Sequence, residues 1–141
     1  MRLKLWGVRG STPTPQIENL IYGGNTACVE VRYHEQVIIL DGGSGIRNLG
    51  QALMEESSRV RELHLFLTHF HWDHIQGIPF FLPLYETDNE MTFYASCQLG
   101  PLQDRLQGQM SKPYFPVSME LGANRKFIEL DDSPVRLGPI T

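Results

Sequence analysis

The rest of the chain is arranged around the stretch from Leu63 to Gly77, LHLFLTHFHWDHIQG. In its first part leucines alternate with other residues over a run that is too short for an ordinary helix, and this predicts a buried strand. His64 lies within that run and is interpreted as a half-buried strand residue rather than a ligand. If the extended geometry continues, His69 and His71 point to the same side, because strand side chains alternate with period two. The stretch therefore predicts a strand that delivers two imidazoles to one place.

The chain must turn after this pair, and the turn adds Asp73 and His74, a carboxylate and a third imidazole. His69 and His71 offer a place for one metal ion, and the two later residues offer ligands to a second. Imidazole and carboxylate ligands together suit Zn, Mn or Fe. The absence of a nearby thiolate argues against a closed structural zinc site. The pattern indicates a catalytic metal site.

Residues 68–74, THFHWDH, resemble the HxHxDH signature of the metallo-β-lactamase superfamily. Two other segments agree. Residues 41–45, DGGSG, resemble the first motif of that family, and residues 7–13, GVRGSTP, are similar to the start of its ribonuclease Z-like and cyclic-phosphodiesterase-like branch. The resemblance implies an α/β fold, the αββα sandwich of two similar halves, with the active site along one edge where loops from both halves meet.

The resemblance also implies that residues 1–141 are a single domain, the N-terminal half of the sandwich, and are incomplete at the C-terminus. The family pattern needs another His, a bridging Asp and a final His downstream of HxHxDH. No histidine follows His74 in this chain. The chain alone is therefore expected to be inactive.

The same resemblance implies roles for individual residues. His69 and His71 would hold one ion, and Asp73 and His74 would contribute to the other. Asp73 would also be the catalytic residue, because it is oriented to handle the proton of the attacking water. Asp41 and Thr68 are expected to lie outside the ligand set and to orient the ligands. The expected cofactors are two divalent transition-metal ions, zinc first, with manganese or iron as alternatives, and substrate-binding residues are not assigned.

Three functions fit these residues. The favoured one is a phosphodiesterase that uses a hydroxide held by two metal ions on a nucleic-acid or cyclic-nucleotide substrate, with a nucleotide or RNA as partner. The second is a hydrolase of the same fold that attacks a thioester, lactone or lactam. The third is a non-catalytic metal-binding or interaction module. The phosphodiester reading gains from the loop over residues 9–25, because its glycines, serine, threonines and Arg9 can donate to phosphate oxygens.

Composition sets the frame. Apolar residues make up 41% of the chain and charged residues 20%, as in ordinary globular proteins. The net charge of −4 gives no reason to expect non-specific attraction to nucleic acid.

Cys28 and Cys97 have no CxxC spacing and are expected to be reduced, buried thiols. Neither a signal peptide nor an apolar span of about 20 residues is visible, so a cytoplasmic protein without membrane contact is expected. A half-sandwich with uncovered edges makes a homo-oligomer possible.

The remaining elements follow from local patterns. We expect strands over residues 2–8, 26–33, 36–40, 91–95, 126–130 and 135–137, a hairpin turn at His34-Glu35, a helix from a Ser44 cap to about Ser57, a segment at 78–85 with a helix start at Pro79, a helix over 101–110 and a loop at 112–116.

Overall fold

The computed structural model describes residues 1–19, 21–34, 36–57 and 60–140, and these form one six-stranded sheet with helices. The strands are β1 (Arg2–Gly7), β2 (Cys28–Tyr33), β3 (Gln36–Leu40), β4 (Glu62–Leu67), β5 (Glu90–Ser96) and β6 (Asn124–Leu130). The α-helices are α1 (Gly45–Glu55), α2 (Trp72–Ile75) and α3 (Leu102–Gln109), and the 3-10 helices are η1 (Ile17–Asn19), η2 (Ile78–Phe80), η3 (Leu82–Tyr85) and η4 (Cys97–Leu99).

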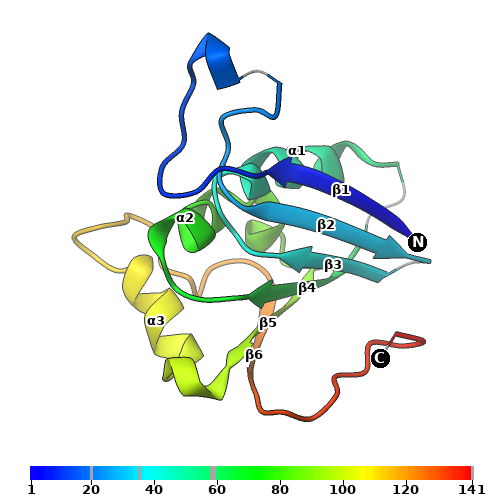
Figure 1. The fold of residues 1–141 in the computed structure, drawn as a ribbon. Helices are drawn as coiled ribbons and strands as arrows, with labels where there is room; N and C mark the ends of the chain where they lie inside the picture. The colour runs from blue at the N-terminus through cyan, green and yellow to red at the C-terminus, as the bar shows by residue number, and fades with distance from the viewer. Residues whose placement is uncertain (20, 35, 58–59, 141) are drawn as a thin grey trace.

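The strands lie in sequence order across the sheet. β1 pairs with β2 and β2 with β3 in antiparallel fashion, and β3 to β6 pair in parallel. Because two reversals restore direction, β1 runs the same way as β3 to β6, and the carboxyl ends of these five strands meet at one end of the sheet (Figure 1). The segments that follow β1, β3 and β4 in the chain therefore all begin at this end of the sheet.

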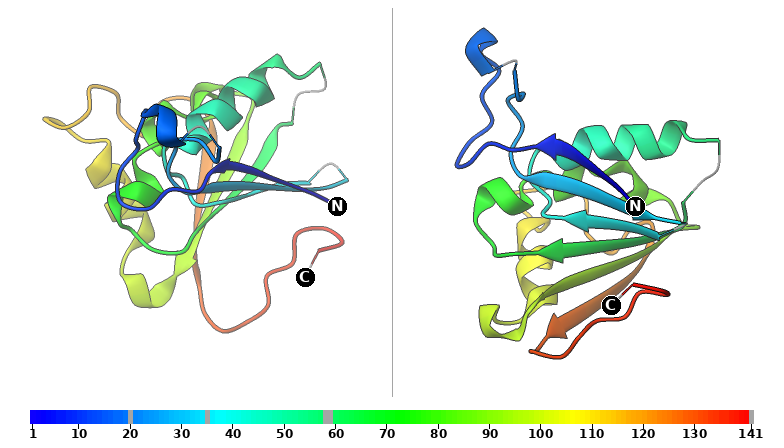
Figure 2. Two further views of the ribbon diagram at one scale, coloured as in Figure 1. Left: turned by 45° about the horizontal axis from the view of Figure 1, so that its top comes forward. Right: turned by 45° about the vertical axis from the view of Figure 1, so that its right-hand side comes forward.

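Helices cover one face of the sheet. Leu63, Leu65 and Leu67 of β4 are buried, as the alternating pattern predicts, and they join the core with apolar residues of α1 and α3. The amphipathic pattern of α1 places Ile46 and Leu49 in that core with no exposed surface. Figure 2 shows α1 on one side of the sheet and the C-terminal segment on the other.

The opposite face of the sheet keeps apolar side chains in solvent. Leu3 and Leu5 of β1 are each 58% exposed, and Leu40 and Ile128 are 38% and 40% exposed. His64 lies on this side as a buried strand residue, with Nδ1 3.0 Å from the Tyr94 hydroxyl. The six-stranded sheet with helices on one face agrees with an α/β half-sandwich, whose second layer the described residues do not form.

Several local predictions were right and others were wrong. The hairpin is confirmed, with Tyr33 paired to Gln36, while the predicted turn residue Glu35 lies outside the described residues. The predicted strand at 135–137 is wrong within the described residues, because only an isolated bridge joins Leu137 to Ile140. The segment at 78–85 forms the two short helices η2 and η3. Among the described helices, none has the length and apolar composition to cross a bilayer.

Three further predictions differ from the structure. Ser44 does not cap α1 with its side chain, because its hydroxyl accepts from the Thr26 amide at 2.9 Å and donates to Asn25 at 3.0 Å. The helix also ends at Glu55 rather than near residue 57. Cys97 is exposed instead of buried, whereas Cys28 is buried, and burial with the nearby Asp41 carboxylate raises the pKa of the Cys28 thiol.

The exposed apolar face predicts self-association of the 141-residue chain, because contact between two such faces removes apolar surface from water. We expect light scattering to report dimers or larger species. Leu5→Lys should shift the population toward monomer, since it places a charge on this face. Ile17→Lys is the matched control, because Ile17 is 81% exposed but lies on the loop away from the sheet. A monodisperse wild-type monomer would contradict this expectation.

Candidate metal centre

The histidine segment stands at the end of the sheet where β4 stops. His69 and His71 lie beside each other with ring centroids 4.4 Å apart, as the period-two argument predicts. Asp73 and His74 belong to α2 and turn back toward this pair, so that the His74 ring centroid lies 4.1 Å from that of His69. The Asp73 carboxylate is 3.4 Å from Nε2 of His74. All four predicted ligands therefore gather at one place.

The Asp41 carboxylate is hydrogen-bonded to the segment that carries these side chains. Asp41 follows β3 and is 7% exposed. Its Oδ1 accepts from the Thr68 amide at 2.9 Å, and the Thr68 hydroxyl lies 3.0 Å from both carboxylate oxygens. Its Oδ2 is 2.8 Å from Nδ1 of His74. These contacts tie the ends of β3 and β4 to α2, which is what residues that orient the ligands would do.

The same contacts assign the imidazole tautomers. The Thr68 hydroxyl has one hydrogen and donates it to Asp41, so its oxygen accepts from Nδ1–H of His69 at 2.9 Å. Nδ1–H of His74 donates to Asp41. In the neutral form of each ring, Nε2 then carries the lone pair. An orienting hydrogen bond on one imidazole nitrogen with a lone pair on the other is the usual arrangement of metal-binding histidines.

Glycines bring α2 close to the end of β3. The Gly42 amide donates to the His74 carbonyl at 2.7 Å, and the Gly77 amide donates to the Gly42 carbonyl at 2.9 Å. A Cβ placed on Gly43 would lie 2.2 Å from the Asp73 carbonyl oxygen, a distance that no side chain tolerates. The glycine pair is therefore needed for backbone contact rather than for binding a nucleotide phosphate.

The loop after β1 reaches the same edge. The Ser11 amide donates to Oδ2 of Asp73 at 2.8 Å. This hydrogen bond, with weaker contributions from the neighbouring backbone and histidines, holds the pKa of the Asp73 carboxyl below its usual value. The Arg9 guanidinium instead donates to Asn19 at 2.8 Å, within the loop. The sequence indicated hydrogen-bond donors in this loop but not that Ser11 contacts Asp73, because the pairing spans 62 positions.

The described residues do not make a closed metal site. Among them, no group of three or more His, Cys, Asp or Glu side chains is arranged to hold an ion. The donor chemistry nevertheless fits a metal such as zinc, because three imidazoles and a carboxylate lie together and two of the imidazoles have their Nδ1 atoms already bonded. The contacts do not divide the four side chains into two separate pairs, since His69 touches both His71 and His74.

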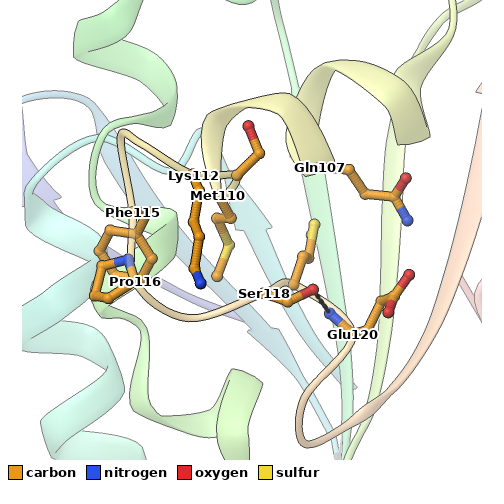
Figure 3. Close-up of a pocket in the computed structure, with 9 residues that line it drawn as sticks. Gln107, Met110, Lys112, Phe115, Pro116, Ser118 and Glu120 are labelled. Carbon is orange, nitrogen blue, oxygen red and sulfur yellow. Dashed lines mark hydrogen bonds between the residues drawn. The ribbon is translucent and has the colours of Figure 1, made fainter.

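A hollow on the surface lies away from the histidine segment. It has a volume of about 370 Å³ and lies between the end of α3 and the segment over residues 111–120. Figure 3 shows Lys112 running down this hollow beside Met110, with Ser118 across from it. None of its lining residues belongs to the histidine segment. It is therefore not part of the candidate metal centre.

Comparisons with known proteins agree with this geometry. A family model described as the metallo-beta-lactamase superfamily matches residues 21–89. A ribonuclease Z from Haloarcula marismortui is 26% identical over 141 residues, which are 96% of this chain and 42% of that protein. A ribonuclease Z from Thermococcus kodakarensis is 30% identical over 112 residues, which are 72% of this chain and 33% of that protein. The chain thus spans less than half the length of these relatives.

A solved structure shows the same fold. The crystal structure of a diphosphatase from the PhnP family superposes with a TM-score of 0.67 at 19% identity, over 96% of this chain and 53% of that one. This coverage agrees with the N-terminal half of the sandwich. Members of the family are hydrolases that use divalent metal ions, typically zinc. The family model, the two ribonuclease Z sequences and the shared fold make the chain similar to the metallo-beta-lactamase superfamily, and the histidine edge agrees with that similarity.

Proposed function

We propose that residues 1–141 form the N-terminal part of a metal-dependent phosphodiesterase. The observation that carries the proposal is the hydrogen-bond network that starts at Asp41 and engages Nδ1 of His69 and of His74, so that their Nε2 atoms are the ring nitrogens left to bind a metal ion beside the Asp73 carboxylate. A purely structural cluster of histidines has no need for a buried carboxylate that fixes the ring nitrogens. A metal-binding edge needs such a carboxylate to orient its ligands.

We propose two divalent ions, zinc first, with manganese or iron as alternatives. His69, His71, Asp73 and His74 would hold them, with further ligands from outside residues 1–141. Two findings support this proposal: the chain covers only 42% and 33% of the ribonuclease Z sequences, and the described residues do not close a ligand set. When bound, such ions polarise the phosphoryl oxygen and make a water molecule a better nucleophile.

The chain's own residues would position the substrate and move a proton. In phosphodiester hydrolysis, water adds to phosphorus and the bond from phosphorus to the leaving oxygen breaks. Asp73 would accept the proton of the attacking water, since its carboxylate is held by the Ser11 amide and faces His74. Asp41 and Thr68 would keep the imidazoles in place. The loop over residues 9–25 would supply backbone N–H groups to phosphate oxygens.

A phosphodiester suits this edge better than a carbonyl compound. The loop that contacts Asp73 contains several hydrogen-bond donors, which a charged phosphodiester uses more fully than a lactam or thioester does. Two sequence relatives carry the name ribonuclease Z, and a structural neighbour is called a diphosphatase. RNA or a nucleotide is therefore the proposed substrate class. A cytoplasmic location remains a prediction.

Metal binding gives the first test of this proposal. We expect the complete protein that contains residues 1–141 to bind two ions, and Asp41→Ala to weaken zinc binding about 10- to 100-fold, because the His74 ring loses its anchor. Thr68→Val should act in the same direction through His69. Affinity is measured by competition with a coloured chelator, and a thermal melt checks folding.

The control for the metal experiment is Asp132→Ala, which removes an exposed carboxylate from a turn. It should leave the affinity unchanged. His71→Ala should lower the metal content in either the complete protein or the 141-residue chain. Unchanged affinity in folded Asp41→Ala and Thr68→Val proteins would show that this network does not support a metal ion.

Substrate preference gives the second test. With zinc or manganese, the complete protein should cleave an aryl phosphodiester faster than a lactam or a thioester at equal concentration. Asp73→Ala should lower kcat/KM for the phosphodiester by about 10²- to 10⁴-fold, the range for loss of a general base. Circular dichroism should show an unchanged fold.

Opposite results would favour other functions. Carbonyl turnover that exceeds phosphodiester turnover tenfold, about 1.4 kcal/mol of transition-state preference, would favour a thioester, lactone or lactam hydrolase. Full metal loading without turnover of any class would favour a non-catalytic metal-binding module.

A further inference from the structure

A second hollow adjoins the histidine segment. It has a volume of about 430 Å³ and lies between α2 and α3, which also share a hydrogen bond from Gln109 to the Ile75 carbonyl at 2.9 Å. Phe70 and Trp72 line one side. The α3 end and the segment after it, drawn in yellow in Figure 1, form the other. The volume is in the range of small-molecule sites.

The hollow combines aromatic rings with a cation. Trp72 is 66% exposed and Tyr114 is 81% exposed, so large parts of both rings face solvent. Arg105 lies in the same lining, with its guanidinium carbon 5.7 Å from the centroid of the Phe70 ring. Exposed rings beside an arginine are the groups that bind the flat face of a nucleobase and its phosphate.

The hollow and the candidate metal centre share one piece of backbone. Phe70 alternates with His69 and His71, so extended geometry turns its ring to the side opposite to the imidazoles. Trp72 directly precedes Asp73, and adjacent Cα atoms are about 3.8 Å apart. The hollow and the candidate metal centre are therefore lined by neighbouring residues of one segment.

Gly108 keeps the hollow open. It lies in α3, where glycine is less favourable than alanine, and its backbone has no positive φ that would require it. A Cβ at this position would meet nothing within 4 Å, so packing does not exclude a side chain. Because Gly108 is part of the lining, a larger residue would occupy the hollow without disturbing the core.

We propose that this hollow is the subsite for one unpaired nucleobase of the substrate. Trp72 and Tyr114 stack on the base, and Arg105 contacts the base or its neighbouring phosphate. The subsite determines substrate preference and makes no bond to the reacting phosphorus. Its role in turnover rests on the proposed phosphodiesterase function, whereas binding of the base itself does not.

The test is binding without metal. The complete protein is labelled with fluorotryptophan, stripped of metal with a chelator and titrated with adenosine monophosphate or ribose phosphate, and fluorine NMR follows the Trp72 signal, assigned from its loss in Trp72→Phe. We expect a saturable shift with the nucleotide and none with the sugar phosphate. The signal of Trp6, which donates to Glu30 at 2.7 Å in another part of the sheet, should not move.

Variants separate the subsite from general surface effects. Gly108→Leu, Tyr114→Ala and Arg105→Ala should each weaken nucleotide binding at least tenfold. Tyr33→Ala and Arg47→Ala are matched controls, because neither residue lines the hollow, and they should bind as the wild type does. A thermal melt of each variant excludes unfolding as the cause.

The outcomes distinguish this inference from the proposed function. A Trp72 shift that Gly108→Leu abolishes supports the subsite even if no phosphodiester is cleaved. Phosphodiester cleavage without a Trp72 shift overturns the subsite and leaves the function standing. Equal shifts with the nucleotide and ribose phosphate, or a shift that Gly108→Leu leaves unchanged, also overturn it.

Discussion

The buried carboxylate of Asp41 is the constraint on which the candidate metal centre depends. A charge at 7% exposure is costly unless it is hydrogen-bonded, and here Thr68 and His74 supply those bonds. The residue also has φ of +62°, a left-handed conformation that aspartate tolerates better than most side chains. In this conformation the carboxylate contacts both the end of β4 and α2.

The glycines after Asp41 complete that constraint. Since Gly42 and Gly43 have no side chains, the backbone of α2 can lie directly against them, and the Gly42 amide bonds the His74 carbonyl at 2.7 Å. His74 is thus held twice, by its carbonyl and by its ring. Two motifs that are separate in the sequence therefore act as one structural unit, and a bulky residue at Gly43 would damage the metal edge by colliding with the backbone of Asp73.

Local patterns predicted the parts that depend on local geometry. The alternation around Leu65 gave β4, and the spacing of His69 and His71 gave two adjacent rings. Contacts across the chain were not predictable. The Ser44 hydroxyl is used by Thr26 and Asn25, so the local capping rule failed, and the Ser11 contact with Asp73 has no local signature. The residues at 135–137, which follow a turn at 131–134, suggested a strand, but no neighbouring strand pairs with them among the described residues.

The segment over residues 69–71 has two chemical faces for a simple geometric reason. An extended backbone sends alternate side chains to opposite sides, so imidazoles at His69 and His71 require that Phe70 point away from them. The space on the Phe70 side of the segment is then either filled by other side chains or left open to solvent. Here α3 leaves part of this space open, since Gly108 adds no side chain and Tyr114 is largely exposed. The same alternation that assembles the metal ligands thus leaves an aromatic hollow beside them, so a change in the spacing of this segment would alter both at once.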